Sequence, residues 1–162
     1  MSFKLEIILG PMFSGKSTEL LRRTSRYEAI GKKIFIINHS NDTRTTNFVK
    51  THSNITKIAV KTDKLMSLVE LVDFKESDII GIDEAQFFED LYEFIIYIEN
   101  TDKIVIISGL DGDYQRKPFG KILYCIPLCD TVTKLSAMCM KSKDGTPAIF
   151  SKRIINKNDQ TL

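Results

Sequence analysis

The sequence predicts an α/β domain in which helices flank a parallel β-sheet, and two patterns support this prediction. Four short apolar runs, at residues 5–9, 33–38, 79–82 and 104–108, alternate with helical or polar segments. Nearly continuous apolar runs are typical of strands that are buried on both faces of a parallel sheet. The first run also leads directly into a glycine-containing loop and a helical pattern, as a right-handed crossover between parallel strands requires.

Apolar side chains at helical spacing predict the connecting helices. The pattern from Leu20 to Ile30 predicts a helix that Gly31 ends. Similar spacing predicts a second helix over residues 65–72, and a third is expected from about residue 88 to residue 100. The alternation places a ligand beyond the carboxyl ends of the strands.

Two segments do not fit this alternation. The polar stretch 39–54 is long for a connection, and connections of that length are commonly functional or mobile. The chain after Val132 is β-rich and then irregular from Cys139 onward. We expect a small β-rich C-terminal lid or ribbon there.

The composition is that of one ordinary globular domain. The chain has 162 residues, of which 43% are hydrophobic and 27% charged, and its net charge of +2 gives no argument for nucleic-acid binding. We find no membrane-length apolar run and no signal peptide, so we expect a cytoplasmic protein without a membrane partner. The three cysteines, Cys125, Cys129 and Cys139, are expected to be reduced thiols.

A phosphate-binding loop is the first functional prediction. The pattern G-x-x-x-x-G-K-[ST] is matched by Gly10, Pro11, Met12, Phe13, Ser14, Gly15, Lys16 and Ser17. Backbone N–H groups of such a loop surround a polyphosphate, and the following helix adds the positive end of its dipole. Lys16 then reaches the β- and γ-phosphates, while the hydroxyl of Ser17, or alternatively of Thr18, binds Mg²⁺. The alternative is a simple glycine-rich turn between strand and helix.

The third apolar run ends in two carboxylates, Asp83 and Glu84. In a phosphate-loop protein, Asp83 is expected to hold Mg²⁺ directly or through water. Because side chains alternate along a strand, Glu84 should point elsewhere and can accept a proton from a hydroxyl or water. The alternative is an ordinary solvated strand edge.

Aromatic and basic residues gather after the ends of the third and fourth predicted strands. Rings there can stack on a planar base and cations can face phosphate, although core and solvent positions are the alternative interpretation. The residues are Phe87, Phe88, Tyr114, Arg116, Lys117 and Phe119.

Five separated motifs together resemble the type II thymidine kinases of animals, many bacteria and poxviruses. They are GPMFSGKSTEL (10–20), Asp42-Thr43-Arg44 with His52, IDEAQFF (82–88), LDGDYQRKPF (110–119) and KLSAMCM (134–140). The resemblance implies a P-loop NTPase-like fold and transfer of the γ-phosphoryl group of ATP to the 5′-hydroxyl of thymidine. The poxvirus-like form of several motifs suggests a viral salvage enzyme, active in the host cytoplasm, and the family habit suggests a homotetramer.

The resemblance also assigns roles by position. Glu84 becomes the general base, Ser17 and Asp83 serve Mg²⁺, and Asp42, Arg44 and Gln86 join the phosphate loop in binding ATP. The residues expected to contact thymidine are Met12, Phe87, Leu110, Tyr114, Phe119 and Ser151. Tyr114 replaces the usual Phe and Asp113 the usual Thr, but a ring remains for base binding.

The C-terminal part departs from the family pattern. Family members have a zinc site made of two Cys-x-x-Cys-like pairs, whereas here only Cys139 is retained and no Cys or His follows it. One thiolate cannot make a four-ligand zinc site, so zinc is expected to be absent, and Cys125 and Cys129 are expected to be buried thiols. We therefore divide the chain into a kinase domain, 1–136, and a shortened remnant of the zinc-ribbon and lid subdomain, 137–162.

Two other functions remain possible from the residues. The sequence DEAQ (83–86) also occurs as the acidic motif of RNA helicases, but these need two motor domains. A nucleotide-binding relic or regulatory protein without kinase activity is the other alternative.

Overall fold

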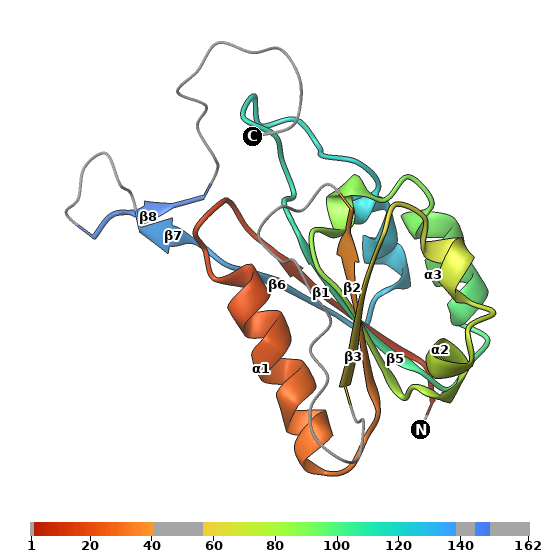
Figure 1. Cartoon of the computed structure of the whole chain (residues 1–162). Helices are drawn as coiled ribbons and strands as arrows, with labels where there is room; N and C mark the ends of the chain where they lie inside the picture. The colour runs from red at the N-terminus through yellow and green to blue at the C-terminus, as the bar shows by residue number, and fades with distance from the viewer. Residues whose placement is uncertain (1, 41–56, 139–144, 150–162) are drawn as a thin grey trace.

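A parallel six-stranded sheet forms the centre of the molecule in the computed structural model, which describes residues 2–40, 57–138 and 145–149 (Figure 1). The strand order is β3-β2-β4-β5-β1-β6, and every neighbouring pair is parallel. The strands are β1 (Lys4–Leu9), β2 (Ile34–His39), β3 (Lys57–Thr62), β4 (Ile79–Ile82), β5 (Ile104–Gly109) and β6 (Thr131–Lys134). The predicted α/β fold with a P-loop NTPase-like parallel sheet is thus confirmed.

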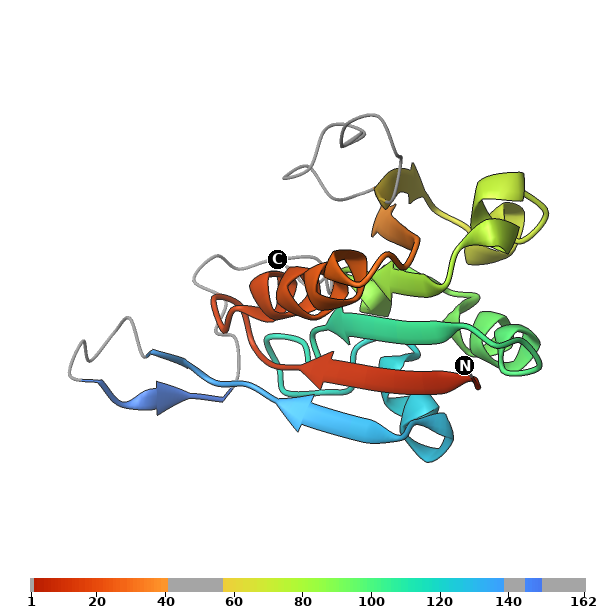
Figure 2. The same ribbon diagram turned by 90° about the horizontal axis from the view of Figure 1, so that it is seen from below.

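Helices cover both faces of this sheet (Figures 1 and 2). The long helix α1 (Lys16–Ala29) packs on one face through Leu20 and Tyr27. The other face is covered by η1 (Leu65–Leu68), α2 (Val72–Glu76), α3 (Leu91–Ile98) and the 3₁₀ segment η3 (Ile122–Leu128). A short 3₁₀ turn, η2 (Ala85–Phe87), follows β4.

Alternation along each strand divides the core into two layers. Leu5, Ile7 and Leu9 of β1 face the layer beneath α3, whereas Ile8 faces α1. In β5, Val105 and Ile107 belong to the first layer, and Ile104 and Ile106 to the second. Burial on both faces explains why these strands are nearly continuously apolar in the sequence.

The predicted strands at 5–9, 33–38, 79–82 and 104–108 correspond to β1, β2, β4 and β5. Strands β3 and β6 were not predicted, because they lie at the two edges of the sheet and are only partly buried or exposed. An edge strand needs no continuous apolar run.

The single helix predicted over residues 65–72 is wrong. The structure has the 3₁₀ turn η1 and, after a break, the short helix α2. The carboxylate of Asp90 accepts hydrogen bonds from the N–H groups of Leu65 (3.2 Å) and Met66 (2.9 Å), which starts the 3₁₀ turn. Val72, the last residue of the apolar pattern, is 67% exposed and begins the next helix.

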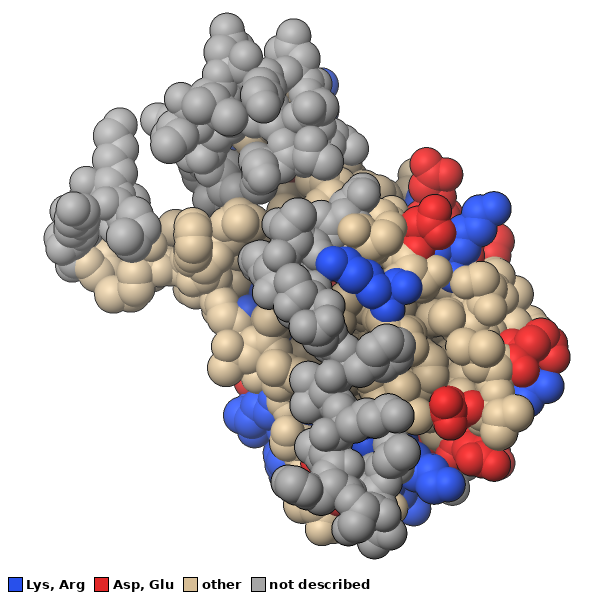
Figure 3. Space-filling model, in the orientation of Figure 1, with Lys and Arg blue, Asp and Glu red and all other residues tan. Residues whose placement is uncertain are grey.

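A two-stranded antiparallel ribbon follows the sheet, in agreement with the β-rich region expected after Val132. It consists of β7 (Ala137–Met138) and β8 (Pro147–Ala148) and extends away from the sheet beyond β6 (Figure 2). In the three described ranges, no helix has the length and apolar character that crossing a bilayer requires. Basic and acidic side chains are interspersed on the described surface in Figure 3.

Candidate functional site

The loop between β1 and α1 has the backbone of a phosphate-binding loop. Phe13 (φ 62°) and Gly15 (φ 84°) adopt left-handed conformations, which turn the chain sharply before α1 begins at Lys16. The Pro11 carbonyl accepts hydrogen bonds from Ser14 Oγ (2.8 Å) and Lys16 Nζ (2.7 Å). The loop is therefore wrapped around the Lys16 side chain at the positive end of a 14-residue helix, an arrangement suited to binding an anion.

Asp83 joins this loop to the end of β4. Its carboxylate accepts hydrogen bonds from Ser17 Oγ (2.8 Å), Ser108 Oγ (2.9 Å) and the Glu84 N–H (3.0 Å). The pKa of the Asp83 carboxyl is raised, mainly because the group is buried. The hydrogen bond from Ser17 lowers this pKa, whereas the charge of Glu84 raises it. The structure thus brings together Ser17 and Asp83, the two oxygen ligands predicted for Mg²⁺.

Glu84 lies beside Asp83, but the pleat of a strand does not set its direction. Strand β4 ends at Ile82, and Glu84 has a left-handed backbone (φ 52°, ψ 44°) that starts η2. A left-handed turn, and not the expected alternation along a strand, therefore directs this carboxylate. A non-glycine residue in this conformation costs about 1–3 kcal/mol and is typical of functional sites. The Glu84 side chain is buried, and its Oε2 accepts a hydrogen bond from Gln86 Nε2 at 2.7 Å.

Several residues predicted to contact a base lie together after β4 and β5. The rings of Phe87 and Phe119 meet edge to face, with centroids 5.5 Å apart. Leu110 is buried, and its N–H donates to Gln86 Oε1 at 3.1 Å. Met12 lies in the loop after β1, and Tyr114 in the loop after β5, where its hydroxyl accepts a hydrogen bond from Gln115.

Other residues of these motifs have structural roles. Phe88 is fully buried and packs on His39 at 4.8 Å between centroids, so the alternative interpretation as a core residue holds for it. Asp113, which replaces the usual Thr, is buried and accepts hydrogen bonds from the N–H groups of Gln115 (2.8 Å) and Lys117 (3.0 Å). It shapes the turn after β5.

Five predicted positions lie outside the described residues. They are Asp42, Arg44, His52, Cys139 and Ser151. Their assigned roles stay predictions.

Ser108 is a residue of the candidate site that the sequence analysis did not single out. It is fully buried in β5 and donates to Asp83 from the strand next to β4. The signal was a single hydroxyl at the end of an otherwise apolar buried run, because a buried hydroxyl needs a hydrogen-bond partner.

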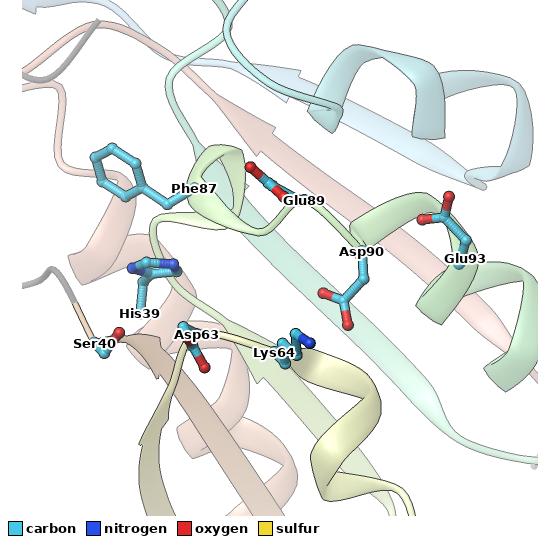
Figure 4. A pocket seen from close by; sticks show the side chains of 8 residues that line it. All are labelled: His39, Ser40, Asp63, Lys64, Phe87, Glu89, Asp90 and Glu93. Atoms are coloured by element: carbon cyan, nitrogen blue, oxygen red, sulfur yellow. The ribbon is translucent and has the colours of Figure 1, made fainter.

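A pocket of about 540 Å³ lies at the carboxyl ends of β2 and β3 (Figure 4). Of the predicted base-contacting residues, only Phe87 lines it. Figure 4 shows His39 and Phe87 on one side of the pocket and Asp90 and Glu93 on the other. Asp90 lines this pocket, and its carboxylate already accepts hydrogen bonds from the first two N–H groups of η1.

Replacing Ser108 by alanine is expected to destabilise the fold. The buried Asp83 carboxylate would lose one of its donors, at a cost of about 1–3 kcal/mol. For a domain of this size that corresponds to a melting temperature lower by about 2–10 °C, measurable by circular dichroism. Ser25→Ala, at an exposed position of α1, is the matched control and should change it by about 1 °C or less. An unchanged Tm for Ser108→Ala would show that its hydrogen bond contributes no stability.

Comparison with known proteins agrees with this geometry. A family model described as thymidine kinase matches residues 3–162. The chain is 48% identical over 150 residues to the thymidine kinase of raccoon poxvirus. The aligned region covers 93% of this chain and 82% of that relative. The chain is 47% identical over 151 residues to the thymidine kinase of vaccinia virus (strain Ankara), with the same coverage.

A likeness to a solved structure concerns the fold alone. The flagellar accessory protein FlaH from Methanocaldococcus jannaschii is similar with a TM-score of 0.55 and 14% sequence identity. The match covers 81% of this chain and 70% of that chain.

Proposed function

Since the chain belongs to the thymidine kinase family, we propose that it transfers the γ-phosphoryl group of ATP to the 5′-hydroxyl of thymidine. The observation that carries this proposal is the hydrogen bond of 2.8 Å between Ser17 and Asp83, which links the phosphate loop to the acidic end of β4. At this point a triphosphate on the loop and a hydroxyl near Glu84 can meet.

In this proposal the loop between β1 and α1 holds the triphosphate of ATP. Its backbone N–H groups and Lys16 bind the phosphates, and Lys16 supplies the positive charge nearest to the transferring group. Asp42, Arg44 and Thr18 remain proposed nucleotide contacts from the family resemblance.

The residues present fit a magnesium ion. Mg²⁺ prefers oxygen ligands and in kinases uses one or two protein groups besides phosphates and water. Ser17 and Asp83 would hold it, since their oxygens lie together at the loop. When bound, the ion neutralises charge that develops on the transferred phosphoryl group.

Glu84 is the proposed general base, because its buried carboxylate lies next to Asp83 and shortly before Phe87 of η2. It would accept the proton of the 5′-hydroxyl as the new P–O bond forms. Phe87, Leu110 and Phe119 would contact the thymine ring, together with Met12, Tyr114 and Ser151 from the resemblance.

Other features of the proposal follow the family. We propose a cytoplasmic homotetramer, in the host cytoplasm if the source is viral, without nucleic-acid or membrane partners. We also propose that residues 1–136 form the kinase domain and residues 137–162 belong to a C-terminal lid subdomain.

Purified protein is expected to hold less than stoichiometric zinc. Residues 140–162 contain no Cys or His that could join Cys139, and burial raises the pKa of the Cys125 thiol to about 12, which disfavours the thiolate that zinc needs. Elemental analysis checks this expectation. About one zinc per chain would contradict it and imply ligands from another subunit.

An ADP-release assay tests the function. With Mg²⁺ and ATP, thymidine should stimulate ADP formation, whereas deoxycytidine and single-stranded RNA, added separately, should not. Stimulation by RNA alone would support a helicase-type ATPase. ADP formation that no additive stimulates would overturn the kinase proposal.

A further inference from the structure

Gln86 is buried between two groups that it can satisfy in only one orientation. Its Nε2 donates to Glu84 Oε2 at 2.7 Å, and its Oε1 accepts from the Leu110 N–H at 3.1 Å. A carboxylate only accepts and a backbone N–H only donates, so the donor and acceptor ends of the amide are assigned without ambiguity. The side chain is 3% exposed. The pattern therefore calls for a residue with both a donor and an acceptor at this length.

Two glycines allow neighbouring backbone to pack closely against Gln86. A Cβ atom at Gly109 would collide with Gln86 Oε1 and would lie 2.9 Å from Ile122 Cδ1. A Cβ atom at Gly120 (φ 62°) would collide with the backbone carbonyl of Gln86. The end of β5 therefore lies close against the Gln86 amide, and the turn before η3 lies close against its backbone.

We propose that Gln86 is a positioning residue, which holds the Glu84 carboxylate in the geometry that accepts the proton of the 5′-hydroxyl. The proposal rests on the proposed function, because it acts only through Glu84 as the base. The same amide ties Glu84 to Leu110, at the start of the loop expected to contact thymine. The Gln86 side chain thus connects the proposed general base, Glu84, with Leu110, a residue expected to contact thymine.

This role differs from the contact with ATP that the family resemblance suggested for Gln86. A positioning role affects the transfer step, since a displacement of about 1 Å in a reacting group can cost about a hundredfold in rate. A nucleotide contact instead affects the affinity for ATP. The two are separable by measuring single-turnover phosphoryl transfer and the Kd for ATP on the same variants.

A double-mutant cycle between Glu84 and Gln86 is the test. Gln86→Met keeps the volume of the side chain and removes both hydrogen bonds. We expect it to lower the single-turnover rate about 10- to 100-fold, with the Kd for ATP within about threefold. In the Glu84→Gln background, Gln86→Met should cost less than about threefold, because no base is left to position.

Equal loss of rate from Gln86→Met in both backgrounds would overturn the proposal, as would a loss confined to ATP affinity. Gln86→Glu is the second variant: it keeps an acceptor for the Leu110 N–H but replaces the donor to Glu84 with a carboxylate. At pH 8 it should lose rate as Gln86→Met does, and full activity would also overturn the proposal.

Two controls separate this result from other failures. Ile122→Val shortens an apolar side chain that packs near Gly109, and it should change Tm without a comparable loss of rate. Thymidine-independent turnover of the wild-type protein would count against the proposed function itself. A normal rate for Glu84→Gln would count against Glu84 as the base.

Discussion

Glu84→Gln is expected to lower kcat for thymidine phosphorylation by roughly 10² to 10⁴, the usual range for loss of a positioned general base. The amide cannot accept the proton of the 5′-hydroxyl, although it keeps the size of the side chain. The phosphate loop is untouched, so the Kd for ATP should stay within a few-fold. Steady-state kinetics and calorimetric titration with ATP measure the two quantities.

Glu89→Gln is the matched control for this substitution. Glu89 is an exposed carboxylate five residues further along the chain, on the rim of the pocket in Figure 4. It should keep normal kcat. A near-normal kcat for Glu84→Gln would remove Glu84 from the role of base.

Lys16→Ala is expected to reduce turnover by about 10² to 10³ and to weaken ATP binding. Lys16 carries the one positive charge in the loop 10–17, and its Nζ lies inside that loop, 2.7 Å from the Pro11 carbonyl. No other residue of the loop can replace its charge near the transferring group. Titration with ATP and single-turnover transfer measure the two effects.

Lys64→Ala, which removes an exposed lysine of the pocket in Figure 4, controls for the change in net charge. It should leave ATP binding and turnover unchanged. If Lys16→Ala also retained normal ATP kinetics, the loop would not be the nucleotide-binding site.

The parts of the fold that could be predicted are those that local chemistry determines. Strands buried on both faces are nearly continuously apolar, so β1, β2, β4 and β5 were visible as runs. The phosphate loop was visible because its backbone needs particular residues at fixed spacing. The contact of Ser17 with Asp83, 66 positions apart, followed from placing both at the carboxyl edge of one sheet.

The remaining parts depend on tertiary partners. Edge strands β3 and β6 bury too little to leave an apolar run. The break between η1 and α2 depends on Asp90, whose carboxylate reaches across to Leu65 and Met66. The direction of Glu84 depends on a left-handed turn, and its link to Gln86 and Leu110 appears only when β4 and β5 lie side by side. No periodicity in the sequence encodes these contacts.

The most direct test of the proposed reaction follows the phosphoryl group itself. Wild-type protein is incubated with Mg²⁺, ATP labelled on its γ-phosphate, and either thymidine or 5′-deoxythymidine, which lacks the acceptor hydroxyl. We expect label to pass to thymidine as the 5′-monophosphate and 5′-deoxythymidine to stay unlabelled. Release of the label as inorganic phosphate at one rate with both nucleosides, and no labelled nucleotide, would contradict it.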